Sequence, residues 1–309
     1  MNRPNFFIIG APKCGTTSLA RWLSSHPQVF MCPVKEPHYF STDFNRGEIG
    51  SLEEYEALFE GAAPEHLAIG EASTEYLYSD NAVPGIENLY KGSRYIVMVR
   101  NPVDLAFSLY NYEKQGGRER ILTFKEAWDQ SPARRSGRHT DSWCSDPKWL
   151  DYQRVALLGQ QFERLLDRVE RSRVLVLVLG DVKRDPRAEY LKVVEFLSLD
   201  DDGRTAFPPE NVAKKRRWRS LTRAIQTAGA ASRDIKKRLG LPVFKGTGLL
   251  RLIDSINSDN SLAPKMDPEV RREVSAYFQK DVRLLSELIG RDVSVSEATV
   301  YKPELGDGR

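Results

Sequence analysis

The first twenty residues constrain the fold more than any other part of the chain. A short apolar run, Phe6–Ile9, lacks polar alternation, which is typical of a strand buried on both faces of a parallel sheet. A loop bounded by Gly10 and Gly15 follows, and three hydroxyl residues then open a helical segment: Thr16, Thr17 and Ser18. A helix N-terminus presents free backbone N–H groups and the positive end of the helix dipole. We therefore expect a phosphate or sulfate site in this loop.

Apolar runs and helical patterns alternate along the rest of the chain. Two further runs are strand-like, 95–99 and 174–179, and 67–69 is a weaker third. Helical spacing of apolar residues is expected over these ranges: 103–115, 152–169, 186–197 and 268–290. The range 131–146 is expected to be a loop. The alternation predicts an α/β, P-loop-like, three-layer fold with a central, mostly parallel sheet flanked by helices.

The position of the loop lysine distinguishes this site from a nucleotide P-loop. In a P-loop the lysine follows the second glycine, and an acid on a neighbouring strand helps to hold magnesium. Here Lys13 precedes Gly15, and the strand 95–99 ends in Arg100. These residues favour a phosphate site without a metal. A magnesium-dependent nucleotide kinase with a variant P-loop is the first alternative, and a capped helix with an exposed lysine is the second.

Composition excludes several classes of protein. The three cysteines and four histidines of this 309-residue chain are scattered, so neither a disulfide framework nor a zinc site is expected. No apolar run approaches the ~18 residues of a membrane span, and the N-terminus lacks a signal-peptide pattern. We therefore expect a soluble, cytoplasmic protein. The net charge of +3 gives no global reason to expect a nucleic-acid partner.

Two motifs together carry a resemblance to a known family. The run from Pro12 to Leu19 resembles the 5′-phosphosulfate loop of the sulfotransferases that use 3′-phosphoadenylyl sulfate (PAPS). The run from Val99 to Ser108 is similar to their second motif, in which an Arg and a Ser hold the 3′-phosphate. The resemblance implies PAPS as sulfuryl donor, 3′,5′-ADP as product and no metal. It also implies these donor contacts: Lys13, Cys14, Gly15, Thr16, Thr17, Ser18, Arg100 and Ser108.

The segment from Lys35 to Phe40 resembles the K-E-x-H-F-F motif of heparan-sulfate-type sulfotransferases and many bacterial relatives. The resemblance implies that Glu36 is the general base that takes the proton of the acceptor hydroxyl. Lys13 would stabilise charge on the departing 3′,5′-ADP. His38 is an alternative base and a candidate acceptor contact, and composition does not decide between the two. A surface turn with a packed histidine is the structural alternative.

A third segment, from Gly70 to Leu77, resembles the E-K-[ST]-x-x-Y-[FL] motif of the same group, although Ala72 replaces its lysine. Glu71 and Ser73 are therefore candidates to line the acceptor site. A helix cap at Ser73 with a nearby carboxylate is equally consistent with the sequence. The acceptor is expected to be a small-molecule, sugar or lipid hydroxyl, in the manner of a soluble bacterial enzyme of secondary metabolism.

Positive charge concentrates in one late stretch. Between residues 211 and 251, twelve Lys and Arg face a single acid, so this stretch is +11 and the remainder is −8. The family resemblance favours Lys215 and Arg216 as further 3′-phosphate contacts. A basic amphipathic helix is expected over 222–241, suited to cover the site, bind an acidic acceptor or contact a membrane surface. A protein that binds nucleic acid or anionic membranes through this patch is a third alternative.

The resemblance implies a single sulfotransferase domain over residues 1–309. Its PAPS-binding core is expected at about 5–200. A basic lid and acceptor-side segment is expected at about 205–262, and a C-terminal helix at about 267–290.

Overall fold

The computed structural model describes residues 2–45, 49–138, 144, 146–209, 215–216, 258–259 and 264–293. Five strands form one all-parallel sheet in the order β2-β3-β1-β4-β5. Their bounds are Val29–Met31 (β2), Ala68–Ala72 (β3), Phe6–Gly10 (β1), Arg94–Val99 (β4) and Val174–Val178 (β5). The α/β architecture and parallel sheet predicted from the sequence are confirmed. The short strand β2 was not predicted, because its three residues carry no recognisable pattern.

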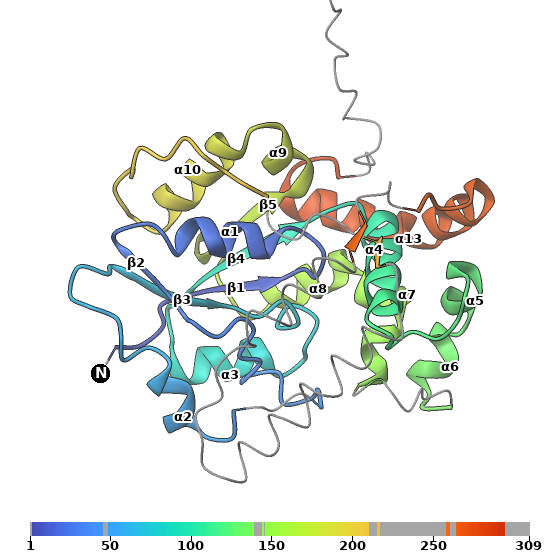
Figure 1. The fold of residues 1–309 in the computed structure, drawn as a ribbon, viewed down its shortest axis with the longest axis horizontal. Helices are drawn as coiled ribbons and strands as arrows, with labels where there is room; N and C mark the ends of the chain where they lie inside the picture. The colour runs from blue at the N-terminus through green and yellow to red at the C-terminus, as the bar shows by residue number, and fades with distance from the viewer. Residues whose placement is uncertain are drawn as a thin grey trace, which may run out of the picture.

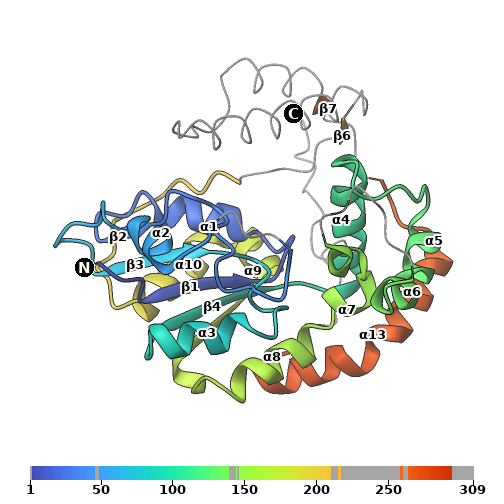
Figure 2. The same ribbon diagram turned by 90° about the horizontal axis from the view of Figure 1, so that it is seen from below.

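Helices cover both faces of the sheet. Figure 2 shows α1 (Thr16–Leu23) and α10 (Pro186–Phe196) on one side, and α3 (Ala82–Leu89) and α8 (Leu158–Leu166) on the other. Helix α4 (Pro102–Gln115) stands at the carboxyl edge of the strands (Figure 1). The described residues also form α2 (Leu52–Ala57), α5 (Phe124–Asp129), α6 (Ser131–Arg135), α7 (Tyr152–Val155), α9 (Leu179–Arg184) and α13 (Pro268–Ile289). Two short 3-10 helices lie at Pro147–Leu150 and Arg171–Arg173. None of the helices among the described residues has the length and apolarity to cross a membrane.

Strand β1 is central because it pairs with β3 on one edge and β4 on the other. Phe6 lies opposite Gly70 of β3 and Arg94 of β4. A Cβ on Gly70 would lie 2.4 Å from the Phe6 ring, so a glycine is required where this ring crosses the neighbouring strand. All five residues of β1 are buried. The loops that follow β1, β3 and β4 therefore emerge together at one edge of the sheet.

The single helix expected over 152–169 is divided in two. Helix α7 ends at Val155 and α8 begins at Leu158. The buried carboxylate of Asp281, on α13, accepts hydrogen bonds from the N–H groups of Gly159 (2.8 Å) and Gln160 (2.9 Å). It thus satisfies N–H groups at the start of α8 that have no partner within the helix. Burial raises the pKa of Asp281, while these two hydrogen bonds offset part of the rise.

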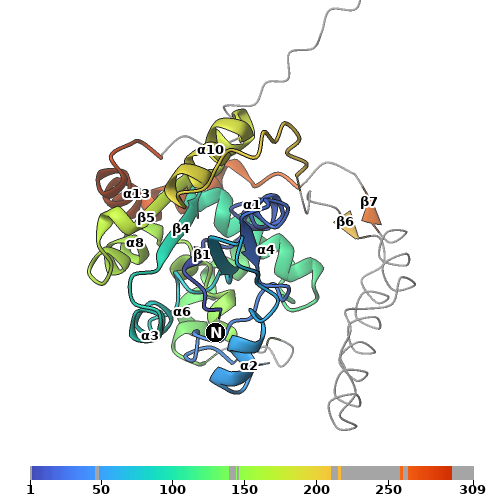
Figure 3. The ribbon, with the colours of Figure 1, turned by 90° about the vertical axis from the view of Figure 1, so that its left-hand side faces the viewer.

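Further differences from expectation lie in the middle and late parts of the chain. Residues 131–135 form helix α6 rather than a loop. Lys215–Arg216 (β6) pairs antiparallel with Ser258–Asp259 (β7), and Figure 3 shows this pair apart from the central sheet. The basic helix expected over 222–241 lies outside the described residues. The C-terminal helix is confirmed as α13.

We expect Gly159→Ala to destabilise the protein by about 2 kcal/mol or more. Its Cβ would lie 2.4 Å from the backbone oxygen of Asp281, so α13 would have to move off α8. Gly180→Ala, in helix α9, is the matched control because a Cβ there meets nothing within 4 Å. The control should be neutral or stabilising by up to about 1 kcal/mol, since alanine is the better helix former. Urea unfolding measures the stability of both variants. Equal free energies of unfolding for Gly159→Ala and Gly180→Ala would contradict the packing argument.

Candidate active site

The loop after β1 is shaped to present its backbone at the start of α1. Gly15 has φ +90°, a left-handed conformation that disfavours residues with a Cβ, and it is the N-cap residue of α1. No side chain caps this end of α1 in the part of the chain that the structure describes. The N–H groups of the first helical turn thus face outward from a loop with a positive helix dipole, which suits an anion.

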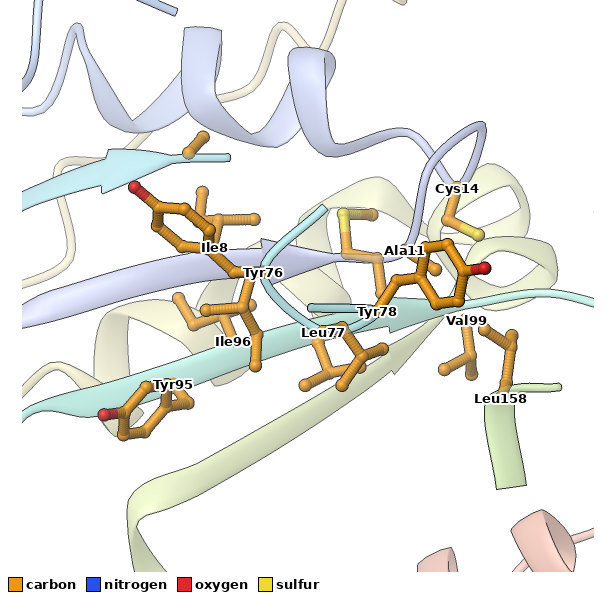
Figure 4. Packing of buried hydrophobic residues seen from close by; sticks show 14 of the residues in the cluster. Ile8, Ala11, Cys14, Tyr76, Leu77, Tyr78, Tyr95, Ile96, Val99 and Leu158 are labelled. Atoms are coloured by element: carbon orange, nitrogen blue, oxygen red, sulfur yellow. The ribbon is translucent and has the colours of Figure 1, made fainter. Parts of the chain in front are cut away.

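The side chains of this loop divide into two groups. Cys14 is fully buried, and Figure 4 shows it with Ala11 and Val99 in the apolar cluster. Thr16 and Ser18 are also buried, whereas Lys13 and Thr17 are partly exposed. The thiol of Cys14 donates weakly to the Pro12 carbonyl at 3.5 Å, so this residue can serve a ligand only through its backbone.

The second predicted motif converges on this loop. Arg100, directly after β4, donates from Nη1 to the Lys13 carbonyl at 3.0 Å. Asn101 caps α4 by accepting from the N–H groups of Val103 (3.0 Å) and Asp104 (3.4 Å). Ser108 is partly exposed on the second turn of α4. The two motifs that are distant in sequence therefore meet at the carboxyl edge of adjacent strands.

Two further residues of α4 and its following turn adjoin Lys13. The Lys13 Nζ lies 4.2 Å from the ring centroid of Tyr112, and the Arg118 guanidinium lies 5.1 Å from the same centroid. Burial lowers the pKa of Lys13; the negative charge of Glu113 opposes this shift, and Arg100 and Arg118 reinforce it. The sequence offered no motif for Tyr112 or Arg118. They make the loop an aromatic-lined, cationic site.

Glu36 is held on the opposite side of the site by the segment that follows β3. Its Oε2 accepts from the backbone N–H of Thr74 (2.8 Å) and from the Thr74 hydroxyl (2.7 Å). The Nζ of Lys35 lies 3.6 Å from Oε1 of Glu36. The Glu36 side chain is 24% exposed. Burial alone would raise the pKa of Glu36, but the charges of Lys35 and His38 and the Thr74 hydrogen bonds outweigh it, so the pKa falls below its usual range. Glu36 is therefore ionised at neutral pH.

His38 lies between two carboxylates. Its Nε2 is 3.7 Å from Oε2 of Glu36, and its Nδ1 is 2.7 Å from Oε1 of Glu75. Its own backbone has φ 57°, and its N–H donates to the Ser73 hydroxyl at 3.1 Å. The sequence analysis did not identify Glu75. The available signal was its spacing four residues after Glu71, in a segment already linked to the site.

Glu71 and Ser73 lie beneath the site rather than on its surface. Both are 0% exposed. The Glu71 carboxylate accepts from the hydroxyls of Tyr55 (2.9 Å), Tyr76 (2.9 Å) and Ser73 (2.6 Å). Burial raises the pKa of Glu71, although these three hydrogen bonds offset part of the rise. We therefore assign Glu71 and Ser73 a supporting position in place of the expected contact with an acceptor, because an acceptor has no access to them.

The two remaining candidates lie in β6. Lys215 pairs with Asp259 and Arg216 with Ser258 through the backbone. The structure does not describe the side chains of this pair, and their expected contact with a 3′-phosphate stays a prediction.

Comparisons with known proteins agree with this geometry. A family model described as a sulfotransferase domain matches residues 3–214. The membrane-associated sulfotransferase kil1 of Dictyostelium discoideum is 33% identical over 114 residues, 36% of this chain and 23% of that protein. Heparan sulfate glucosamine 3-O-sulfotransferase 3B1 of Mus musculus is 26% identical over 196 residues, 63% of this chain and 46% of that protein. The chain thus spans less than half the length of these curated relatives.

A solved structure extends the likeness to nearly the whole fold. The crystal structure of a sulfotransferase from Alicyclobacillus acidocaldarius superposes with a TM-score of 0.68 and 29% identity. The match covers 95% of this chain and 98% of that chain. The predicted family and the predicted fold class are therefore confirmed.

The opposite pKa shifts of Glu36 and Glu71 predict opposite effects of pH on stability. The stabilisation from ionised Glu36 is complete above the pKa of an unfolded glutamate, about 4.3, and is lost as the pH falls through its depressed folded pKa. The free energy of unfolding of the wild type, minus that of Glu36→Gln, should therefore fall on acidification. The same difference for Glu71→Gln should fall as the pH rises, because the folded state disfavours ionisation there. Urea unfolding at a series of pH values on both sides of about 4.3 measures both differences. If the two differences changed in the same direction with pH, the assignment would be contradicted.

Proposed function

Because the chain belongs to the sulfotransferase family, we propose that it transfers a sulfuryl group from PAPS to a hydroxyl acceptor. One observation carries the proposal. The cationic loop of Lys13 and Arg100 and the ionised carboxylate of Glu36 are held at the same edge of the sheet, by segments that follow neighbouring strands. The anionic donor would be held by the cations at this edge, and the acceptor hydroxyl could pass its proton to Glu36.

The donor would be held by the two motifs that meet at Lys13. The N–H groups of the loop and α1, with Thr16, Thr17 and Ser18, would bind the 5′-phosphosulfate. Lys13 would place its charge at the oxygen that joins phosphorus to sulfur. Arg100 is fixed by its hydrogen bond to the Lys13 carbonyl and offers a guanidinium for the 3′-phosphate, together with Ser108. Lys215 and Arg216 would complete that contact.

Transfer would proceed by in-line displacement. The acceptor oxygen forms a bond to sulfur while the bond from sulfur to the bridging oxygen breaks, and the electron pair leaves on 3′,5′-ADP. The hydroxyl proton passes to Glu36. Its Oε2 is occupied by Thr74, so Oε1 is the oxygen left to receive the proton. As in phosphoryl transfer, positioning and charge stabilisation would supply much of the rate, and a base adds a factor of about 10²–10⁴.

The acceptor is proposed to be an aliphatic or sugar hydroxyl on a small molecule, carbohydrate or lipid. The K-E-x-H segment around Glu36 supports this class, and heparan sulfate glucosamine and carbohydrate sulfotransferases are among the relatives. A magnesium-dependent kinase is less well supported, because Arg100 follows β4 where a metal-holding acid would be needed.

Donor binding is the first test. Isothermal titration with 3′,5′-ADP in the presence of EDTA should show binding by the wild type. Lys13→Met and Arg100→Met should each weaken it by about tenfold or more, because each removes a charge-assisted contact. Lys125→Met is the control, since Lys125 is exposed on α5 and paired with Asp129. Absence of binding, or a strict requirement for magnesium, would overturn the proposal.

Turnover is the second test. With radiolabelled PAPS and a panel of alcohol, phenol and sugar acceptors, Glu36→Gln should lower kcat by about 10²–10⁴-fold. Its affinity for 3′,5′-ADP should be unchanged, because the amide oxygen of the substituted side chain can still accept from Thr74. His38→Gln is the parallel variant. Full activity in Glu36→Gln combined with loss in His38→Gln would move the base to His38.

A further inference from the structure

We propose that Thr74 is a positioning residue that binds one oxygen of the Glu36 carboxylate and holds it against the start of the Lys13 loop, so that Oε1 receives the acceptor proton. The inference deepens the proposed function and rests on it for its catalytic consequence. Its structural content, a hydrogen bond from the Thr74 hydroxyl to an ionised Glu36, can be tested without any turnover.

Thr74 contacts both sides of the candidate site. Its backbone N–H and its hydroxyl both donate to Oε2 of Glu36, at 2.8 Å and 2.7 Å. Its carbonyl oxygen passes over Gly10, where an added Cβ would lie only 3.1 Å from it. Gly10 ends β1, and the loop that contains Lys13 begins there. One residue therefore links the carboxylate to the loop where the donor would bind.

The position of Thr74 is fixed by its neighbour in the chain. Ser73 donates its backbone N–H to Ile8 of β1 at 3.1 Å, and its hydroxyl accepts from the N–H of His38 at 3.1 Å. Thr74 itself is 7% exposed, and a β-branched side chain has few favourable rotamers. Its hydroxyl therefore has little freedom to move relative to β1.

The two oxygens of Glu36 have different surroundings. Each carboxylate oxygen offers about two lone-pair sites, and the two donors of Thr74 fill those of Oε2. Oε1 lies 3.6 Å from Nζ of Lys35, which is beyond hydrogen-bond distance. This nitrogen is buried and has no hydrogen-bond partner among the described residues. Oε1 therefore keeps its lone pairs for the acceptor proton, while the charge of Lys35 favours the ionised form.

The charged groups around Glu36 come from two segments. Lys35 and His38 lie in its own loop, and Glu75, which follows Thr74, lies beside His38. Burial raises the pKa of Glu36, whereas the charges of Lys35 and His38 and the two hydrogen bonds from Thr74 lower it. Loss of the Thr74 hydroxyl should therefore raise this pKa.

Thr74→Val tests the proposal because it keeps the shape of the side chain and removes its hydroxyl. With PAPS and the fastest acceptor of the alcohol, phenol and sugar panel, we expect kcat to fall by about tenfold or more, but by less than in Glu36→Gln. The affinity for 3′,5′-ADP should be unchanged. The acid limb of kcat/KM should move to higher pH. Thr74→Ser keeps the hydroxyl and should retain the wild-type kcat and acid limb.

Thr42→Val is the matched control for these kinetic measurements. Thr42 is exposed, and its hydroxyl accepts a hydrogen bond from the Asn81 side chain at 3.0 Å. Its kcat and its acid limb should equal those of the wild type. Thr74→Ala, which also lacks the hydroxyl, carries the same predictions as Thr74→Val if the valine variant does not fold.

Urea unfolding tests the hydrogen bond without turnover. The free energy of unfolding of the wild type, minus that of Thr74→Val, should be positive at neutral pH, because the hydroxyl stabilises the ionised carboxylate. This difference should shrink as the pH falls through the folded pKa of Glu36, which the hydroxyl depresses. The corresponding difference for Thr42→Val should show no such change.

Several kinetic results would overturn the proposal: wild-type kcat in Thr74→Val, equal losses of kcat in Thr74→Val and Thr74→Ser, or a loss of kcat with an unmoved acid limb. A stability difference that does not vary with pH would contradict the hydrogen bond to an ionised Glu36. A wild type that neither binds 3′,5′-ADP nor transfers sulfuryl would instead overturn the proposed function, while the unfolding data would still test the contact of Thr74.

Discussion

The pairing of β1 with both β3 and β4 is the constraint on which the candidate site depends. Ala11, just after β1, donates its N–H to Met98 at 2.7 Å, and Leu77, in the segment after β3, donates to Ile9 at 2.8 Å. These hydrogen bonds continue the sheet beyond its regular strands. They bring the Lys13 loop, the Thr74–Glu75 segment and Arg100 to one edge. Parallel strands place such loops together at their carboxyl ends, where α/β proteins bind ligands.

The edge is divided by charge. On the side of β4 and α4, Lys13, Arg100 and Arg118 gather around Tyr112 and the loop backbone. On the side of β3, three carboxylates surround His38: Glu36, Glu71 and Glu75. A negatively charged donor is attracted to the first group and kept from the second. A base can therefore remain ionised close to an anionic donor, which the proposed reaction requires.

Sequence reasoning reached the parts of this arrangement that have a local cause. The loop at Gly10–Gly15, the strand before Arg100 and the helix that follows Asn101 can be inferred from short-range patterns, and the structure contains all three. The division of the helix at 156–157 could not be predicted, because it depends on Asp281, more than a hundred residues away. The contacts of Glu75 were hidden for the same reason, because Ser41 and Trp149 come from separate segments of the chain.

Burial separates residues that the sequence presents as equals. Glu36 and Glu71 both lie in motifs that resemble the same family, and both were candidates for contact with substrates. Glu71 is fully enclosed and receives only neutral hydroxyl donors, so its pKa rises. Glu36 is partly exposed, lies beside the Lys35 ammonium and accepts two hydrogen bonds from Thr74, so its pKa falls despite its burial. When their environments shift the pKa values of two carboxyl groups in opposite directions, the accessible and ionised carboxylate is suited to act as a base. This contrast supports Glu36 as the proton acceptor and Glu71 as a buried, hydrogen-bonded residue beneath the site.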